Sequence, residues 1–309
     1  MENKKKEQKV DMLPLTSDYV FKRIFSKGGN ERILKSLLEA ILEIKIQKIE
    51  VKNPEIPKET IKEKLSVLDI KAEINENIIL DIEMQVGNTT AIDKRLVVYS
   101  SKLVSGDIKV AEEYLDAKNT IVICITTDNI LKRNAYMSVA KLKFEETQEK
   151  RYVNMGYKKE EENLTDMVSY YIIELTKLKE NKPRTADLLE KWLLIIGGDA
   201  EMMERCRKEE GEIKEAIEQL EEMSADEKER EIYEQREKGR LIYNTEMNEA
   251  RRKGLEEGKK LGEKIGEKNG KKEKTVEIAK KLLEKNIDIE IIIETTGITK
   301  EELETLKNG

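Results

Sequence analysis

The chain has 309 residues, of which 39% are charged and 5% aromatic, and its net charge is −6. This length allows one sizeable core plus accessory segments, and the negative charge argues against a protein that coats nucleic acid by bulk attraction, although a local basic groove is still possible. The absence of histidine excludes Ser-His-Asp and Cys-His catalysis, zinc proteases and nucleases with a histidine base. Catalysis must therefore use carboxylates, lysine, tyrosine or a metal held by oxygen ligands.

Neither a membrane protein nor a secreted protein is expected. The chain has no uncharged apolar run of about 18 residues, the length that a transmembrane helix needs. Residues 1–10 are polar and rich in lysine, without the apolar stretch of a signal peptide behind them. Two cysteines, Cys124 and Cys206, are compatible with a reducing compartment. We therefore expect a cytoplasmic protein with no membrane partner.

Two helices are predicted near the N-terminus. Residues 16–18 offer N-cap oxygens to the first helix. Its apolar residues follow at helical spacing: Val20, Phe21, Ile24 and Phe25. Glycines at 28–29 end this helix, and Asn30 can cap a second one whose apolar face runs over residues 33–42.

Two strands are predicted between residues 66 and 86. Residues 66–74 read S-V-L-D-I-K-A-E-I, and residues 77–86 read N-I-I-L-D-I-E-M-Q-V. Both segments alternate with period two, which is typical of half-buried strands. One face of each strand is apolar. The opposite face carries polar side chains: Asp69, Lys71 and Glu73 on the first strand, Asp81, Glu83 and Gln85 on the second.

The loop between these strands determines which residues face each other. A three-residue loop at 75–77 pairs apolar positions with apolar ones, whereas a two-residue loop would pair them with polar ones. Asp69 then lies opposite Glu83, and Lys71 lies opposite Asp81. Two carboxylates that close repel each other unless a cation such as Mg²⁺ binds their oxygens. A solvent-exposed acidic face, with Lys71 and Asp81 as a cross-strand ion pair, explains the pattern equally well.

Further elements are predicted along the chain. Residues 92–104, bounded by glycines, form a helix. Residues 120–127 read T-I-V-I-C-I-T-T, an apolar and β-branched run that suits a central strand covered on both faces. A helix with lysine and arginine is expected from about residue 134, and one more strand at 169–175.

The C-terminal third is charged and helix-prone. Five glycines recur there at every fourth residue: Gly254, Gly258, Gly262, Gly266 and Gly270. They drift slowly around one side of a helix and leave a bare strip that another protein helix can approach, although a flexible linker is the alternative. The last segment regains apolar periodicity and ends in a short helix, with Thr299 and Glu302 at capping-box positions.

Four segments within residues 13–127 carry a family resemblance. In chain order they read T-S-D-Y-V-F-K-R-I-F, L-D-I-K-A-E, I-E-M-Q and K-R-L-V-V-Y-S-S-K-L. Together they resemble the PD-(D/E)XK nuclease family transposases, also called recombination-promoting nucleases, as do the glycine-rich helix and the short C-terminal unit. The resemblance implies an α/β protein with a PD-(D/E)XK (restriction-endonuclease-like) core, a mixed sheet flanked by helices, and a helical C-terminal extension.

The same resemblance implies roles for individual residues. Asp69 corresponds to the aspartate of the motif and Glu83 to its D/E position, so these two would bind the metal. Gln85 occupies the position usually held by lysine, which helps to orient the attacking water and to stabilise charge. Glutamine can form hydrogen bonds but carries no charge. Lys71, on the same strand face as Asp69, has the best geometry to supply the missing charge, provided that Asp81 does not hold it.

Other residues near these motifs have two interpretations each. Lys94 and Arg95, on the following helix, can replace the missing lysine or can be ordinary surface charges. Glu39 can be an additional acidic residue of the site or a solvated side chain at the edge of the apolar stripe. Tyr99 can contact DNA or pack under the sheet.

The leading hypothesis is a DNA endonuclease, transposase-like and recombination-promoting, that hydrolyses phosphodiester bonds with Mg²⁺ or another divalent cation. Its expected partners are DNA and a second copy of the chain, paired through the C-terminal helical region. Expected domains are a nuclease-like domain at 1–200, a charged helical linker at 201–272, and a small helix-turn-helix-like unit at 273–309. Alternatives are a catalytically weak DNA-binding or oligomeric assembly protein that retains the fold, and a helical interaction protein without a nucleic-acid role.

Overall fold

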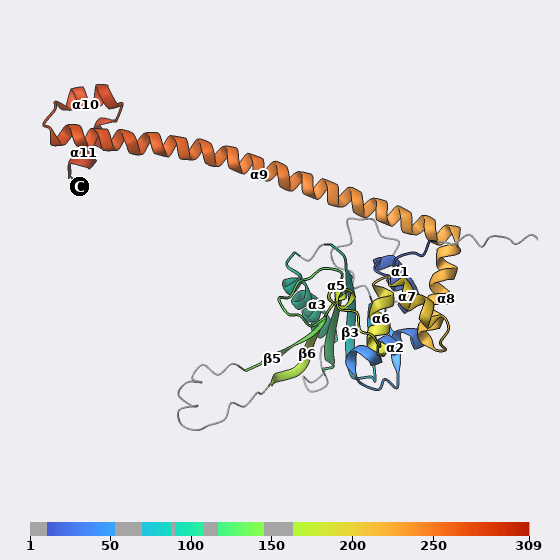
Figure 1. Cartoon of the computed structure of the whole chain (residues 1–309). Helices are drawn as coiled ribbons and strands as arrows, with labels where there is room; N and C mark the ends of the chain where they lie inside the picture. The colour runs from blue at the N-terminus through green and yellow to red at the C-terminus, as the bar shows by residue number, and fades with distance from the viewer. Residues whose placement is uncertain (1–10, 53–69, 88–89, 108–116, 145–162, 309) are drawn as a thin grey trace, which may run out of the picture. The chain divides into compact units, whose positions relative to one another are not determined.

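The computed structural model describes residues 11–52, 70–87, 90–107, 117–144 and 163–308. Their contacts divide the chain into two compact units, Met1–Lys238 and Gly239–Gly309. The first unit contains the sheet and most of the helices, and the second contains the C-terminal helical region (Figure 1).

The first unit is built around a mixed sheet of six strands in the order β1-β2-β3-β4-β6-β5. In chain order the strands are β1 Ile49–Val51, β2 Ile70–Ile74, β3 Ile78–Gln85, β4 Asn119–Thr126, β5 Met137–Lys143 and β6 Asn163–Glu174. The pairs β3–β4 and β4–β6 are parallel, whereas β1–β2, β2–β3 and β5–β6 are antiparallel. The expected mixed sheet is confirmed, and its three parallel strands direct their carboxyl ends to one edge.

Helices cover both faces of this sheet. In chain order they are α1 Asp18–Ser26, α2 Glu31–Leu42, α3 Ile92–Asp107, α5 Leu175–Glu180, α6 Leu188–Ile196, α7 Ala200–Cys206 and α8 Glu212–Ala225. The larger core joins one face of the sheet to α1, α2 and α6 to α8. A smaller core lies on the opposite face, under α3, and consists of Ile79, Leu96, Leu103, Val122 and Cys124. Side chains that alternate along β3 and β4 therefore enter two different cores.

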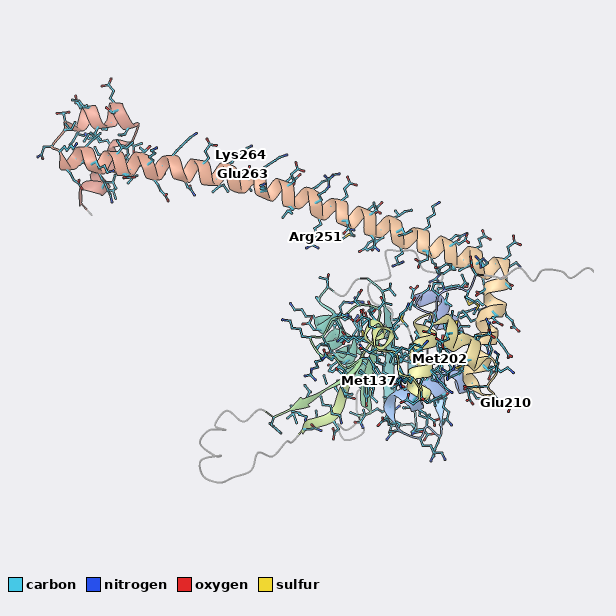
Figure 2. The ribbon with its side chains drawn as sticks, in the orientation of Figure 1. Met137, Met202, Glu210, Arg251, Glu263 and Lys264 are labelled. Atoms are coloured by element: carbon cyan, nitrogen blue, oxygen red, sulfur yellow. The ribbon has the colours of Figure 1, made fainter. Side chains whose placement is uncertain are left out.

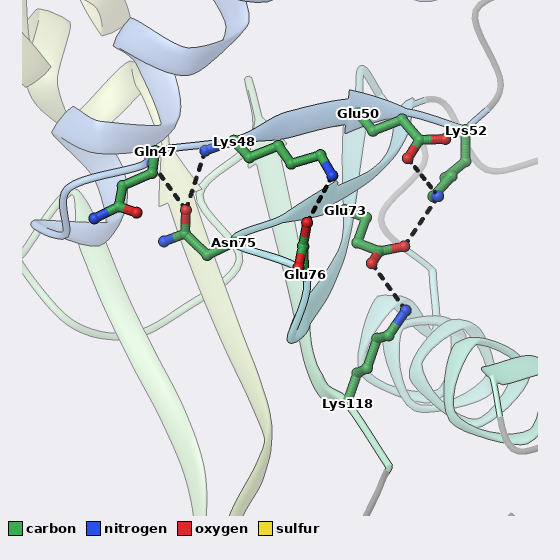
Figure 3. Close-up of polar contacts among 8 residues, drawn as sticks. All are labelled: Gln47, Lys48, Glu50, Lys52, Glu73, Asn75, Glu76 and Lys118. Carbon is green, nitrogen blue, oxygen red and sulfur yellow. Dashed lines mark hydrogen bonds and ion pairs between the residues drawn. The ribbon is translucent and has the colours of Figure 1, made fainter.

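The turn between β2 and β3 has the predicted length. Ile74 pairs with Ile78, and Lys71 pairs with Asp81, so a three-residue loop connects the strands. Asn75 has a φ angle of 50° and accepts hydrogen bonds on its side-chain oxygen from two backbone amides near β1 (Figure 3). Asparagine tolerates this left-handed conformation better than most residues, so the sequence of the turn suits its geometry.

Strand β4 confirms the expectation of a central strand covered on both faces. It is paired on each side by a parallel neighbour, and residues 121–126 are all buried. Ile123 faces the larger core and Cys124 the smaller one. The nearly continuous apolar run is what a parallel strand buried on both faces requires.

The expectation of a helix from about residue 134 is wrong. Residues 137–143 form strand β5, antiparallel to β6, with register shifts on either side of Leu142. Pairing with a strand far along the chain supplies the backbone hydrogen bonds, and helical propensity is too weak to oppose it. The strand expected at 169–175 is β6, which begins earlier at Asn163. Helix α3 continues through Gly106 to Asp107.

Helices α7 and α8 belong to the compact unit that contains the sheet, although composition assigned residues 201–272 to a linker. Met202, Cys206, Ile217 and Leu220 are at most 1% exposed and contribute to the larger core. This unit accordingly continues to Lys238. Where the functional domains begin and end stays a prediction.

The second unit contains most of helix α9, Glu227–Glu284, followed by α10 Ile289–Thr296 and α11 Lys300–Asn308. Ala279, Ile292, Ile298 and Leu303 form its small core. The predicted capping box is confirmed, because the Glu302 amide donates to the Thr299 hydroxyl and the Thr299 amide donates to the Glu302 carboxylate. All five glycines of the ladder lie within α9, where charged side chains such as those of Arg251, Glu263 and Lys264 are exposed (Figure 2).

A network of ion pairs connects β1, β2 and β4 at the end of the sheet where the β2–β3 turn lies. The Glu73 carboxylate on β2 lies 2.8 Å from the Lys118 ammonium, just before β4, and 3.0 Å from the Lys52 ammonium, just after β1 (Figure 3). These hydrogen bonds, that of Lys118 foremost, hold the pKa of the Glu73 carboxyl below its usual value.

We predict that Glu73→Gln lowers the free energy of unfolding at neutral pH by about 1 kcal/mol. The pKa of Glu73 is lower in the folded state, so its stabilisation is present above the unfolded-state pKa and is lost as the pH falls through the folded-state value. Urea unfolding of both proteins from pH 7 downward measures this. Glu76→Gln, which removes only an exposed pair with Lys48, is the control. A difference that does not shrink at low pH would contradict the prediction.

Candidate active site

The polar face of β3 is buried under α3. Asp81 is fully buried and Glu83 is 2% exposed, while Gln85 is partly exposed at the end of the strand. These residues alternate with Leu80, Ile82 and Met84, which enter the larger core. The two carboxylates therefore do not belong to a solvent-exposed face, which was the competing interpretation of the pattern.

Burial makes these carboxylates costly. Removing an ionised carboxylate from water costs several kcal/mol unless hydrogen bonds or opposite charges replace the lost hydration. Glu83 receives one such hydrogen bond from the side-chain amide of Gln85, with 3.1 Å between Nε2 and Oε2. A charge kept at a position where an apolar side chain would pack well is a common sign of a functional site.

The opposite end of the Gln85 amide contacts a cation. Arg95, in the first turns of α3, donates from Nη2 to Oε1 of Gln85 over 3.0 Å. The same nitrogen lies 3.3 Å from the Tyr99 hydroxyl, and the guanidinium carbon lies 5.9 Å from the centre of the Tyr99 ring. Gln85 thus connects a guanidinium from α3 to the buried carboxylate of Glu83. Only a side chain that both accepts and donates can make this connection.

The structure brings Arg95 to Gln85 directly, whereas sequence reasoning ranked Lys71 first as the missing cation. Lys71 is partly buried and pairs across the strands with Asp81 in the predicted register. Tyr99 is 8% exposed, which favours packing within the fold over contact with DNA. Glu39, the other acidic candidate, stabilises the loop between α2 and β1, because its carboxylate accepts a hydrogen bond from the Ile46 amide over 2.8 Å.

Asp69 lies outside the described residues, so its predicted position opposite Glu83 stays a prediction. The pairs that are described, from Ile74↔Ile78 to Ile70↔Ile82, follow the predicted register up to the neighbouring position. Among the described residues, no group of three or more acidic or thiol side chains lies close enough together to hold a metal ion. The donors offered here are carboxylate oxygens, which suit a hard divalent cation such as Mg²⁺.

The carboxyl end of β3 adjoins a loop that sequence reasoning did not single out. The Thr127 amide donates to the Gln85 carbonyl over 3.2 Å, and the Gly87 amide donates to the Asp128 carboxylate over 3.1 Å. Glu174, at the end of β6, is fully buried and also binds this loop. A charged residue inside the apolar run of residues 172–175 was the signal that could have identified it.

A mixed α/β sheet with buried carboxylates on its third strand, covered by a helix that supplies a cation, defines a restriction-endonuclease-like core. Residues 15–250 match the model of the PD-(D/E)XK nuclease family transposases. Because this match covers well over half of the sequence, the chain belongs to that family. Residues 272–308 match the C-terminal helix-turn-helix domain of the Rpn/YhgA-like nuclease family.

Comparisons with curated proteins and with solved structures gave no match. Within the part of the chain that the structure describes, no helix has the length and apolar character needed to cross a membrane. Family membership supports a nuclease-type function, and nucleases of this type generally use divalent metal ions.

Proposed function

We propose that this protein is a DNA endonuclease that hydrolyses phosphodiester bonds with Mg²⁺ or another divalent cation, in a transposase-like, recombination-promoting role. The observation that carries the proposal is the buried Glu83 carboxylate, linked through Gln85 to Arg95, in a chain of the PD-(D/E)XK family. We also propose the cytoplasm as its compartment, because Cys124 and Cys206 are both buried and neither forms a disulfide.

The proposed division of labour follows from the chemistry of the side chains. Asp69 and Glu83 would hold the cation through carboxylate oxygens, and Lys71 adds a positive charge on the same strand face. When bound, a divalent cation lowers the pKa of water and stabilises charge on the phosphate. Gln85 keeps the Glu83 carboxylate in one orientation through its amide hydrogen bond. Arg95 supplies the positive charge that the lysine of the usual motif would carry.

The C-terminal helix-turn-helix match favours DNA as the partner. A helix-turn-helix unit can hold the chain on DNA while the core does the chemistry. The runner-up function, a catalytically weak DNA-binding or assembly protein that keeps the nuclease fold, differs from the leading one only in cleavage. Cleavage by the unaltered protein, and its loss in the carboxylate variants, therefore separates the two.

We predict that Asp69→Ala and Glu83→Ala each abolish Mg²⁺-dependent nicking of plasmid DNA. Each variant should keep its fold, since removing one carboxylate relieves repulsion in the metal-free protein. Circular dichroism checks the fold, and Glu76→Ala, in the exposed turn of the same hairpin, is the control for the loss of one carboxylate. Normal nicking by either variant would refute the site, and no nicking by the unaltered protein would favour the runner-up.

Four further variants test which cation replaces the usual lysine. Arg95→Gln is expected to lower the cleavage rate by roughly a hundredfold, because the Gln85–Glu83 pair loses its fixed orientation and its charge. The neighbouring exposed Lys94→Gln should leave the rate unchanged. A larger loss in Lys71→Gln than in Arg95→Gln would return the role to Lys71. Gln85→Lys is expected to be tolerated, although it breaks the contact with Arg95, because a lysine at the motif position would itself place a positive charge beside Glu83.

We further propose that α9 pairs two copies of the chain. Exposed apolar residues recur one heptad after ladder glycines, as in Gly254 with Leu261 and Gly258 with Ile265, and so share their side of the helix. A Cβ atom added at any of the five glycines would meet nothing within 4 Å. The opposite side carries ion pairs within the helix: Glu249–Lys253, Glu256–Lys260 and Glu267–Lys271.

Sedimentation velocity at micromolar concentration tests this pairing. The full chain is expected to sediment as a dimer, and Gly258→Gln/Gly262→Gln as a monomer, because bulk on the bare strip keeps the helices apart. Both substitutions raise helix propensity, so loss of α9 itself is not a concern. The control is Glu256→Gln/Lys260→Gln on the opposite side. A full chain that runs as a monomer would show that the ladder is a hinge instead.

A further inference from the structure

Residues 127–136 connect β4 to β5 and begin beside the candidate active site. The Thr127 amide binds the Gln85 carbonyl, and the Asp128 carboxylate accepts from the Gly87 amide over 3.1 Å. The loop follows the carboxyl end of a parallel strand, which is where open α/β sheets bind their ligands. The first residues of the loop therefore lie at the carboxyl end of β3, and the loop continues along the same edge of the sheet toward the end of β6.

A buried ion pair holds the loop in one conformation. Glu174 is fully buried at the end of β6, and its Oε1 accepts from the amides of Ile130 and Leu131 over 2.6 and 3.0 Å. Its Oε2 lies 2.5 Å from the Lys177 ammonium, which also donates to the Leu131 carbonyl over 2.8 Å. Both charged groups thus bind the loop backbone. Burying a charge pair is costly, so this clamp implies that the position of the loop matters.

Two cationic residues directly follow the part of the loop that Glu174 and Lys177 bind. Lys132 and Arg133 directly follow Leu131, and both side chains are exposed. Neither forms a hydrogen bond or an ion pair with any residue that the structure describes, whereas the nearby Lys177 and Arg95 are both engaged. Two such cations, next to backbone that a buried ion pair holds at the same edge of the sheet as the candidate site, are suited to bind the phosphates of an extended anion. Attraction of DNA would depend on local groups of this kind, because the net charge of the chain is −6.

We propose that residues 128–134 form a phosphate-binding loop, in which Lys132 and Arg133 contact the DNA backbone close to the bond that is cut. This rests on the proposed nuclease function and adds the surface that would position its substrate. Glu174 and Lys177 are positioning residues, which act only through the backbone of residues 130 and 131.

The test is the salt dependence of DNA binding by the full chain. Fluorescence anisotropy with a short fluorescein-labelled duplex, in EDTA to prevent cleavage, gives the slope of the logarithm of affinity against the logarithm of salt concentration. Lys132→Ala/Arg133→Ala is expected to reduce the magnitude of this slope by about 1.8, because each lost phosphate contact contributes about 0.9. The charge-preserving swap Lys132→Arg/Arg133→Lys should restore it.

The matched control removes the same charge at the other end of β3. Lys45→Ala/Lys48→Ala lies beside the β2–β3 turn, where the Asn75 side-chain amide donates to the Lys45 carbonyl and Lys48 pairs with the exposed Glu76 (Figure 3), and should leave the slope unchanged. If the protein binds and cuts DNA but the loop variant keeps the original slope, the phosphate-binding loop is refuted while the nuclease function stands. An equal reduction in the control would also refute it. Absence of any DNA binding by the unaltered protein would refute both.

Discussion

The pairing of β3 with its neighbours is the constraint on which the core and the candidate site both depend. Along β3, Leu80 and Ile82 enter the larger core, while Asp81 and Glu83 face α3. A slip of one residue against β2 would reverse both sets and place two carboxylates among aromatic and aliphatic side chains. The three-residue turn, stabilised by the side chain of Asn75, prevents that slip.

The two hydrogen bonds of the Gln85 side chain explain how glutamine can stand at a position usually held by lysine. A lysine at position 85 would only donate hydrogen bonds, whereas the Gln85 amide donates to Glu83 and accepts from Arg95. In the proposed site, the helix that covers the strand would carry the positive charge in place of the strand. Arg95 in turn lies against Tyr99, one helical turn further along α3, so the cation is held by the packing of the helix.

At the edge of the sheet where the parallel strands end, the backbone is held first by strand pairing and then by hydrogen bonds to the loop. Parallel pairing brings the ends of β3, β4 and β6 together. Beyond these ends, hydrogen bonds from the loop to Gln85, Asp128 and Glu174 replace strand pairing. Loops that bind substrates are usually positioned by rigid elements, and here a buried charge pair makes the connection. Rigidity at this edge is consistent with a site that must align a phosphodiester bond.

The sequence by itself determined the strands β2 to β4, the register of β2 against β3, the capping box at Thr299 and the family, because these follow from local alternation, turn chemistry and motif order. The tertiary structure decided what depends on partners far along the chain. Strand β5 exists only because β6 pairs with it, so its segment was misread as helix. The burial of Asp81 and Glu83, the contact of Arg95 with Gln85, and the clamp of Glu174 on residues 130–131 likewise join distant segments. Local periodicity shows which residues share a face, but only packing shows what covers that face.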